Sequence, residues 1–133
     1  MKITLLLCVL LLTACSQYKD GKYQCKGSVR SITAAGSTTS GNQQIAFRLD
    51  NDKVSFSGNE FLVGDQIGVC EIGSNEFAKK DELFFDTSGC GTNRKNQESR
   101  KYGTYNKLSK VLVLTNEDSN GLIYGTFACD HTN

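Results

Sequence analysis

The feature of this sequence that most restricts its fold is a series of short segments in which apolar and polar residues alternate. Ile45, Phe47 and Leu49 alternate with Ala46 and Arg48, a spacing that places every second side chain on one face of a β-strand. Turn-forming pairs such as Asn-Asp and Asn-Gly separate the segments at short intervals, and no helical repeat is present. The pattern predicts an all-β fold, a small antiparallel β-barrel or sandwich of seven to eight strands, in which the cysteines are expected to form two disulfides.

The expected strands are defined by this alternation, and one intervening segment lacks it. They cover residues 22–25, 45–49, 53–56, 66–72, 82–88, 102–106, 110–115 and 122–129. Segment 31–41 has no periodic apolar face and is therefore expected to form a mobile loop.

The N-terminal residues have the layout of an export signal. A basic Lys2 precedes the apolar run 3–12 and the small residues Thr13 and Ala14. The run is about half the roughly 20 residues that a membrane-spanning helix needs. Residues 1–14 are therefore predicted to be a signal peptide that is removed.

The sequence Leu12-Thr13-Ala14-Cys15 resembles the lipobox of bacterial lipoproteins. In that family the cysteine thiol receives a diacylglyceryl group, the signal peptidase cuts just before it, and the new amine is usually acylated. The resemblance implies lipidation at Cys15 and a lipidated tether over 15–20. The rest of the chain is long enough for one compact domain and short for two, so a single β domain over 21–133 is expected. Ser16 in place of an aspartate implies sorting to the outer membrane of a Gram-negative cell, facing the periplasm or the cell surface.

The charge of the chain is balanced. It has 15 basic and 14 acidic side chains, and removal of Lys2 with the signal leaves equal numbers. This balance gives no electrostatic basis for nucleic-acid binding.

Four cysteines remain after the signal and the lipidated residue: Cys25, Cys70, Cys90 and Cys129. An exported chain meets an oxidising compartment, and the wide spacings lack the close pairs of zinc sites, so two disulfides are predicted. Three pairings are possible. An aromatic residue stands two positions before both Cys25 and Cys129. If the two terminal strands are neighbours, as in a closed barrel, Cys25 pairs with Cys129 and Cys70 with Cys90.

No residue pattern indicates catalysis, a cofactor or a metal site. His131 is the one histidine and stands near the C-terminus, where it is expected to lie in a solvated tail, and Cys90 has no histidine to activate it. The acidic residues Asp50, Asp52 and Glu60 lack the spacing of a calcium loop. The protein is therefore predicted not to be an enzyme.

Segment 91–102 is the most unevenly charged part of the domain, and it is expected to be a long hairpin loop. Its basic residues and the aromatic that follows them are Arg94, Lys95, Arg100, Lys101 and Tyr102. One interpretation is a solvated loop, and the other is a loop that binds an anionic envelope ligand or a protein, with Tyr102 as anchor. The predicted function is that of a lipid-anchored envelope lipoprotein whose β domain binds a protein or envelope ligand.

Two alternatives stand beside this function. The tripeptide Tyr23-Gln24-Cys25 and the short lipoprotein layout resemble the membrane-bound lysozyme inhibitors. Members of that family have a small disulfide-closed barrel and insert a Ser-Gly-x-Arg-Tyr loop into lysozyme, for which this chain has residues 99–102 without the glycine. The other alternative is a structural or receptor-masking envelope protein, with an exposed apolar patch at 61–63.

Overall fold

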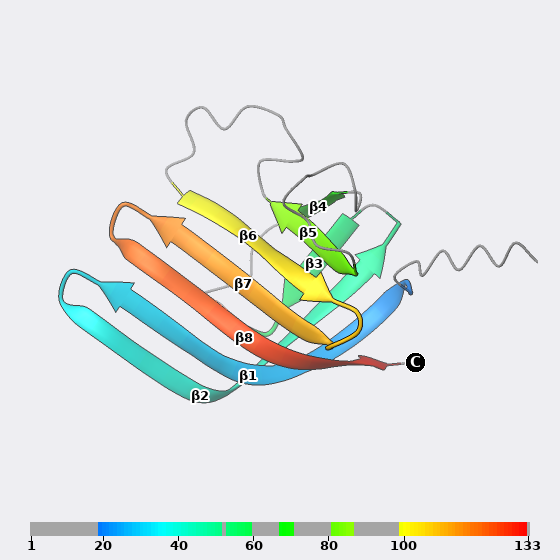
Figure 1. Ribbon diagram of the computed structural model, residues 1–133, viewed down its shortest axis with the longest axis horizontal. Helices are drawn as coiled ribbons and strands as arrows, with labels where there is room; N and C mark the ends of the chain where they lie inside the picture. The colour runs from blue at the N-terminus through cyan, green and yellow to red at the C-terminus, as the bar shows by residue number, and fades with distance from the viewer. Residues whose placement is uncertain (1–18, 52, 60–66, 71–80, 87–98, 133) are drawn as a thin grey trace, which may run out of the picture.

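The computed structural model describes residues 19–51, 53–59, 67–70, 81–86 and 99–132. These residues contain eight strands, β1 (Gly21–Thr33), β2 (Gly36–Asp50), β3 (Lys53–Ser57), β4 (Ile67–Cys70), β5 (Glu82–Asp86), β6 (Ser99–Asn106), β7 (Val111–Asp118) and β8 (Gly121–Thr132). Each strand pairs antiparallel with the next, and β8 pairs with β1, so the sheet closes into a barrel (Figure 1). The prediction of an all-β antiparallel barrel or sandwich is confirmed, and of the two the fold is a barrel.

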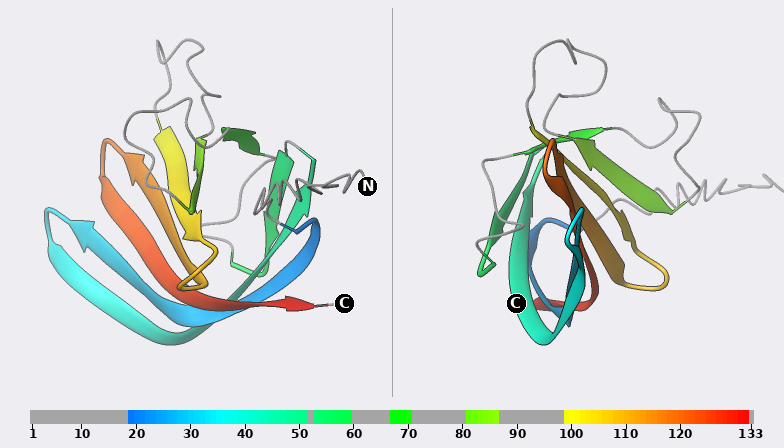
Figure 2. Two further views of the ribbon diagram at one scale, coloured as in Figure 1. Left: turned by 45° about the vertical axis from the view of Figure 1, so that its right-hand side comes forward. Right: turned by 90° about the vertical axis from the view of Figure 1, so that its left-hand side faces the viewer.

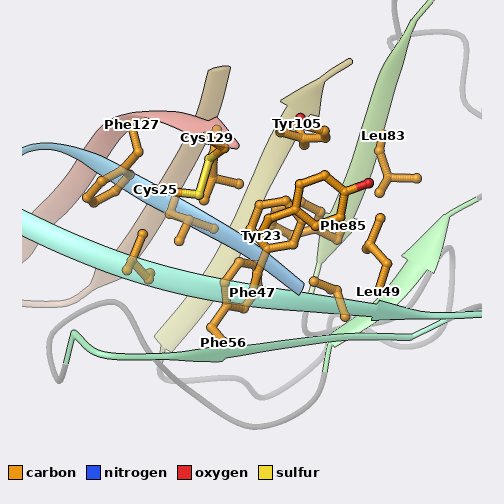
Figure 3. Packing of buried hydrophobic residues seen from close by; sticks show 14 of the residues in the cluster. Tyr23, Cys25, Phe47, Leu49, Phe56, Leu83, Phe85, Tyr105, Phe127 and Cys129 are labelled. Carbon is orange, nitrogen blue, oxygen red and sulfur yellow. A yellow bond between two sulfur atoms is a disulfide. The ribbon is translucent and has the colours of Figure 1, made fainter. Parts of the chain in front are cut away.

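Alternation along the strands creates the core, as the sequence predicts. In β2 the side chains of Ile45, Phe47 and Leu49 are buried, whereas Arg48 between them is exposed. Alternate positions of the other strands add aromatic and aliphatic side chains to the same interior (Figure 3). The Tyr23 ring stacks on Phe47 at 4.5 Å between centroids. The barrel is therefore filled by side chains that close packing holds in place.

A disulfide joins the two terminal strands inside this core. Cys25 and Cys129 stand directly opposite each other in the β1–β8 register, and their sulfur atoms lie 2.04 Å apart (Figure 3). Both residues are buried. The predicted Cys25–Cys129 pairing is confirmed, because the terminal strands are neighbours. Cys90 and the side chain of Cys70 lie outside the described residues, and so does the second predicted disulfide.

The expectation of a loop at 31–41 is wrong. Residues 29–33 of β1 pair with 36–40 of β2 across a turn at Ala34 and Ala35, and 28–33 also pair with 121–126 of β8. We call residues 28–42 together with 121–126 the arm. The arm includes the buried Val29 at its base and carries strands past the filled part of the barrel, whereas the start of β1 and the end of β8 lie at the opposite end (Figures 1 and 2). Residues 32–42 are exposed, so no apolar alternation is needed there.

A β-bulge marks the base of the arm. The β1–β2 register shifts between Gly27 and Val29, and on the facing strand Asn42 adopts a φ of 54°. A Cβ atom at Gly27 would overlap the carbonyl oxygen of Thr126 on β8. The missing side chain therefore lets β1 and β8 approach closely where the barrel wall continues into the arm.

Candidate functional site

The predicted binding loop is in part a strand. Cys15, Arg94 and Lys95 lie outside the described residues, whereas Arg100, Lys101 and Tyr102 belong to β6. The backbone of 99–102 pairs in register with residues 115–118 of β7. The expectation of a loop reaching to residue 102 is wrong, because these polar residues pair with an equally polar strand end.

Strand alternation separates the predicted site residues. Lys101 lies on the same face of β6 as Gly103 and the buried Tyr105, whereas Tyr102 lies on the outer face of the sheet. The Tyr102 hydroxyl donates a hydrogen bond to Glu117 Oε2 at 3.3 Å. Lys101 and Tyr102 therefore do not share one binding surface.

Neighbouring strands bring other side chains beside Tyr102 on the outer face. The strand register aligns Tyr102, Thr115, Tyr124 and Arg30 in one row across four strands. The next row contains Glu117, Leu122 and Ile32. We call this surface the outer-face patch, and its members are Arg30, Ile32, Tyr102, Thr115, Glu117, Leu122 and Tyr124.

The patch combines exposed apolar surface with hydrogen-bonding groups. Ile32 is 38% exposed, and the tyrosines and Leu122 are half-buried. Arg30 is exposed, with its Nη2 3.5 Å from Ser37 Oγ. Tyrosine and arginine, which here lie beside aliphatic side chains, are residue types enriched at protein interfaces. No single stretch of sequence reveals the patch, because its members come from four strands that only the barrel register brings together.

A line of positive charge runs along β1 toward the patch. Lys22, Lys26 and Arg30 are exposed and share the outer face at intervals of four residues. Asp130 of β8 stands opposite Gln24, between the two lysines. The outer face of β1 is therefore basic, and its row of cations reaches into the arm.

The end of the barrel that lies opposite the arm is closed by aromatic side chains. The pKa of Tyr105 is raised to about 12 by burial first, and then by Tyr23 and Asp130. Burial and the charge of Asp20 also raise the pKa of Tyr23. Both phenols therefore keep their protons at neutral pH.

His131 belongs to this closed end, so the expectation of a solvated tail is wrong. Its ring meets Tyr23 edge-on at 4.8 Å, and its Nε2 lies 3.0 Å from the carbonyl oxygen of Asp20. The Tyr23 hydroxyl donates to the carbonyl oxygen of Lys19 at 2.6 Å. The last residues of β8 are held in the sheet by their pairing with β1. The contacts of His131 and Tyr23 then hold Lys19 and Asp20, which precede β1, against this end of the barrel.

The described residues contain no group of three or more side chains suited to hold a metal ion. Asp50 is exposed opposite Lys53, whereas Asp52 and Glu60 lie outside the described residues. No helix among the described residues is long and apolar enough to cross a membrane.

Comparison of the chain with protein-family models, curated proteins and solved structures found no match. The resemblances to bacterial lipoproteins and to lysozyme inhibitors stay predictions. Residues 99–102, on which inhibition would depend, lie in a paired strand. Residues 61–63, the predicted apolar patch, lie outside the described residues.

Proposed function

We propose that the protein is a non-enzymatic, lipid-anchored lipoprotein of the bacterial outer membrane that binds a protein partner through the outer-face patch. The observation that carries this proposal is the arm, which continues the sheet past the filled core and has aromatic, aliphatic and arginine side chains on its outer face. Little of that surface is needed to bury the core. Exposed surface of this composition on a rigid sheet is typical of recognition sites.

The geometry supports a lipid attachment at the end of the barrel opposite the arm. Lys19 and Asp20 are hydrogen-bonded to Tyr23 and His131 at the closed end. Lys19 is four positions after Cys15, so an extended tether would hold that end within about 14 Å of the lipid. The 13 residues of β1 then extend about 40 Å toward the arm. An anchored protein would present the patch away from the membrane.

A variant of the two patch tyrosines tests this binding. The lipidated protein with Tyr102→Ala and Tyr124→Ala should capture at least tenfold less partner from detergent-solubilised envelope, because central tyrosines contribute about 2 kcal/mol or more each at such interfaces. Both side chains lie outside the core, so the circular dichroism spectrum should not change. Ser55→Ala and Lys53→Ala on the outer face of β3 form the matched control. Equal capture by the tyrosine variant and the control would contradict the proposal.

The basic residues of 91–102 need a separate test, because Lys101 lies on the face of β6 opposite Tyr102 and Arg94 and Lys95 lie outside the described residues. Replacing Arg94, Lys95, Arg100 and Lys101 with serine should weaken capture and reduce its salt dependence if these charges attract the partner. If capture by this variant is unchanged at low salt, the partner binds through the outer-face patch without these charges. The basic segment would then be a solvated part of the surface that takes no part in binding.

A further inference from the structure

The outer edge of the arm is formed by residues 36–42 of β2. Residues 36–40 pair with β1 on one side, whereas the pairing of β2 with β3 begins only at Ala46. Within the described part of the chain, no strand pairs with the other side of 36–42. All seven residues are exposed. Just beyond them the edge is covered, because the Asn59 side chain donates to Gln43 Oε1 at 3.2 Å.

This edge lacks the features by which proteins usually protect a strand. Natural edge strands carry charged side chains, particularly lysine, or proline, and these block pairing with another chain. Residues 36–42 read Gly-Ser-Thr-Thr-Ser-Gly-Asn, without a charge or a proline. Only the bulge beside Gly41 and Asn42 interrupts the edge, which leaves 36–40 as a regular segment. Five residues is an ordinary length for a paired strand.

We propose that two copies of this chain associate through residues 36–40, antiparallel about a two-fold axis at Thr38, so that one sheet continues through both arms. In that register Thr38 faces its own equivalent, Ser37 faces Thr39 and Gly36 faces Ser40. Such an interface is isologous, with the same residues contributed by each copy. This association is separate from the partner binding proposed above, and it requires neither the lipid nor the outer-face patch.

Self-complementarity favours a second copy over a foreign peptide. Every pair in this register is small and neutral, and opposed threonine and serine side chains stabilise antiparallel strands. No like charges meet. The nearest charged side chain on the outer face is Arg30, one strand inside the edge. Its equivalent in the second copy would lie three strand spacings away, at least about 14 Å, where physiological salt screens most of the repulsion.

The size of the contact sets the expected strength. One short strand per copy buries far less than the roughly 800 Å² per partner of a stable interface. Association in solution should therefore be weak, with a dissociation constant in the micromolar range or above. Copies attached to one membrane would meet at a much higher effective concentration.

Photo-cross-linking in cells tests the contact with the full chain. A benzophenone side chain at Thr39, on the proposed interface, should yield a covalent dimer of this protein. The same probe at Thr126 is the matched control, since this residue is exposed on the same outer face but lies on β8, between β1 and β7. Cross-linking of Thr39 to another protein without the dimer, or to nothing, would overturn the proposal.

Charge exchange at the two-fold position tests the register. Thr38→Lys alone and Thr38→Asp alone each place like charges directly opposite, which should weaken dimerisation of the purified full-length protein in detergent by up to about fivefold. An equal mixture of the two variants should restore it, because lysine then faces aspartate. Sedimentation velocity measures both effects, and circular dichroism checks folding. No loss in the single variants, or no recovery in the mixture, would overturn the antiparallel pairing.

Discussion

Removal of the Cys25–Cys129 disulfide tests how the barrel is closed. The bond joins residues separated by 104 positions, so it restricts most of the unfolded domain. On the chain-entropy model a loop of about 100 residues is worth about 4.7 kcal/mol of unfolding free energy. Replacement of both cysteines by alanine also removes two buried sulfur atoms, at a further cost of about 1 kcal/mol each. The double alanine variant should therefore lose about 5 to 7 kcal/mol.

Guanidinium unfolding of the wild type and of the variant measures this loss. With an m-value of about 3 kcal/mol per molar for a domain of this size, the midpoint should fall by about 1.7 to 2.3 M. The m-value should rise, because an unfolded chain without the cross-link is less compact and exposes more surface. Unfolding of the wild type after reduction separates the cross-link from the packing of the sulfurs.

A total loss below about 2 kcal/mol with an unchanged m-value would refute the argument. It would show that the unfolded state is not restricted by the bond, and that the β1–β8 ladder alone closes the barrel. A variant that is already unfolded in buffer agrees with the prediction, because small domains have only about 5 to 15 kcal/mol of stability in total.

Three further predictions follow from other parts of the molecule. Gly27→Ala should lower the unfolding free energy by about 1 to 3 kcal/mol, because the added Cβ atom would overlap the carbonyl oxygen of Thr126. Urea unfolding measures this loss, and Gly41→Ala is the control, because no atom lies within 4 Å of a Cβ at that position. Folding raises the pKa of Tyr105 from 10.0 to about 12, so the unfolded state releases its proton first. Stability from this residue should be complete below pH 10 and decline as pH rises through 12, and Tyr105→Phe should remove that decline in urea unfolding. Cys15→Ser should abolish lipid labelling and leave uncut precursor, as gel mobility after metabolic labelling would show; normal processing would contradict a lipobox.

The filled part of the barrel could be predicted from the sequence because burial and alternation coincide there. Strand β2 shows this at Ile45, Phe47 and Leu49, whose side chains must leave water together and therefore recur at every second position. The disulfide pairing was predictable for the same reason. An aromatic two residues before a cysteine places both on one face, and closure then makes Cys25 and Cys129 neighbours.

The candidate site could not be predicted in the same way, because its members are joined only by the strand register. Tyr102, Tyr124 and Arg30 are far apart in the chain and align across β6, β7, β8 and β1. The basic segment was visible in the sequence, but charge alone did not reveal that Lys101 and Tyr102 point to opposite faces. The partly buried position of His131 could not be predicted either, because its place near the C-terminus does not reveal that its backbone pairs with β1.

The arm was missed for a physical reason that also explains its proposed role. An apolar alternation arises only where one face of a strand is buried, and residues 36–42 bury neither face. Backbone pairing carries no such signature, so a serine- and threonine-rich strand resembles a loop until its partners are known. The same neutral, small side chains leave the backbone groups at the edge accessible to another strand. The absence of a core pattern therefore marks the segment of this barrel that is best suited to pair with a second chain.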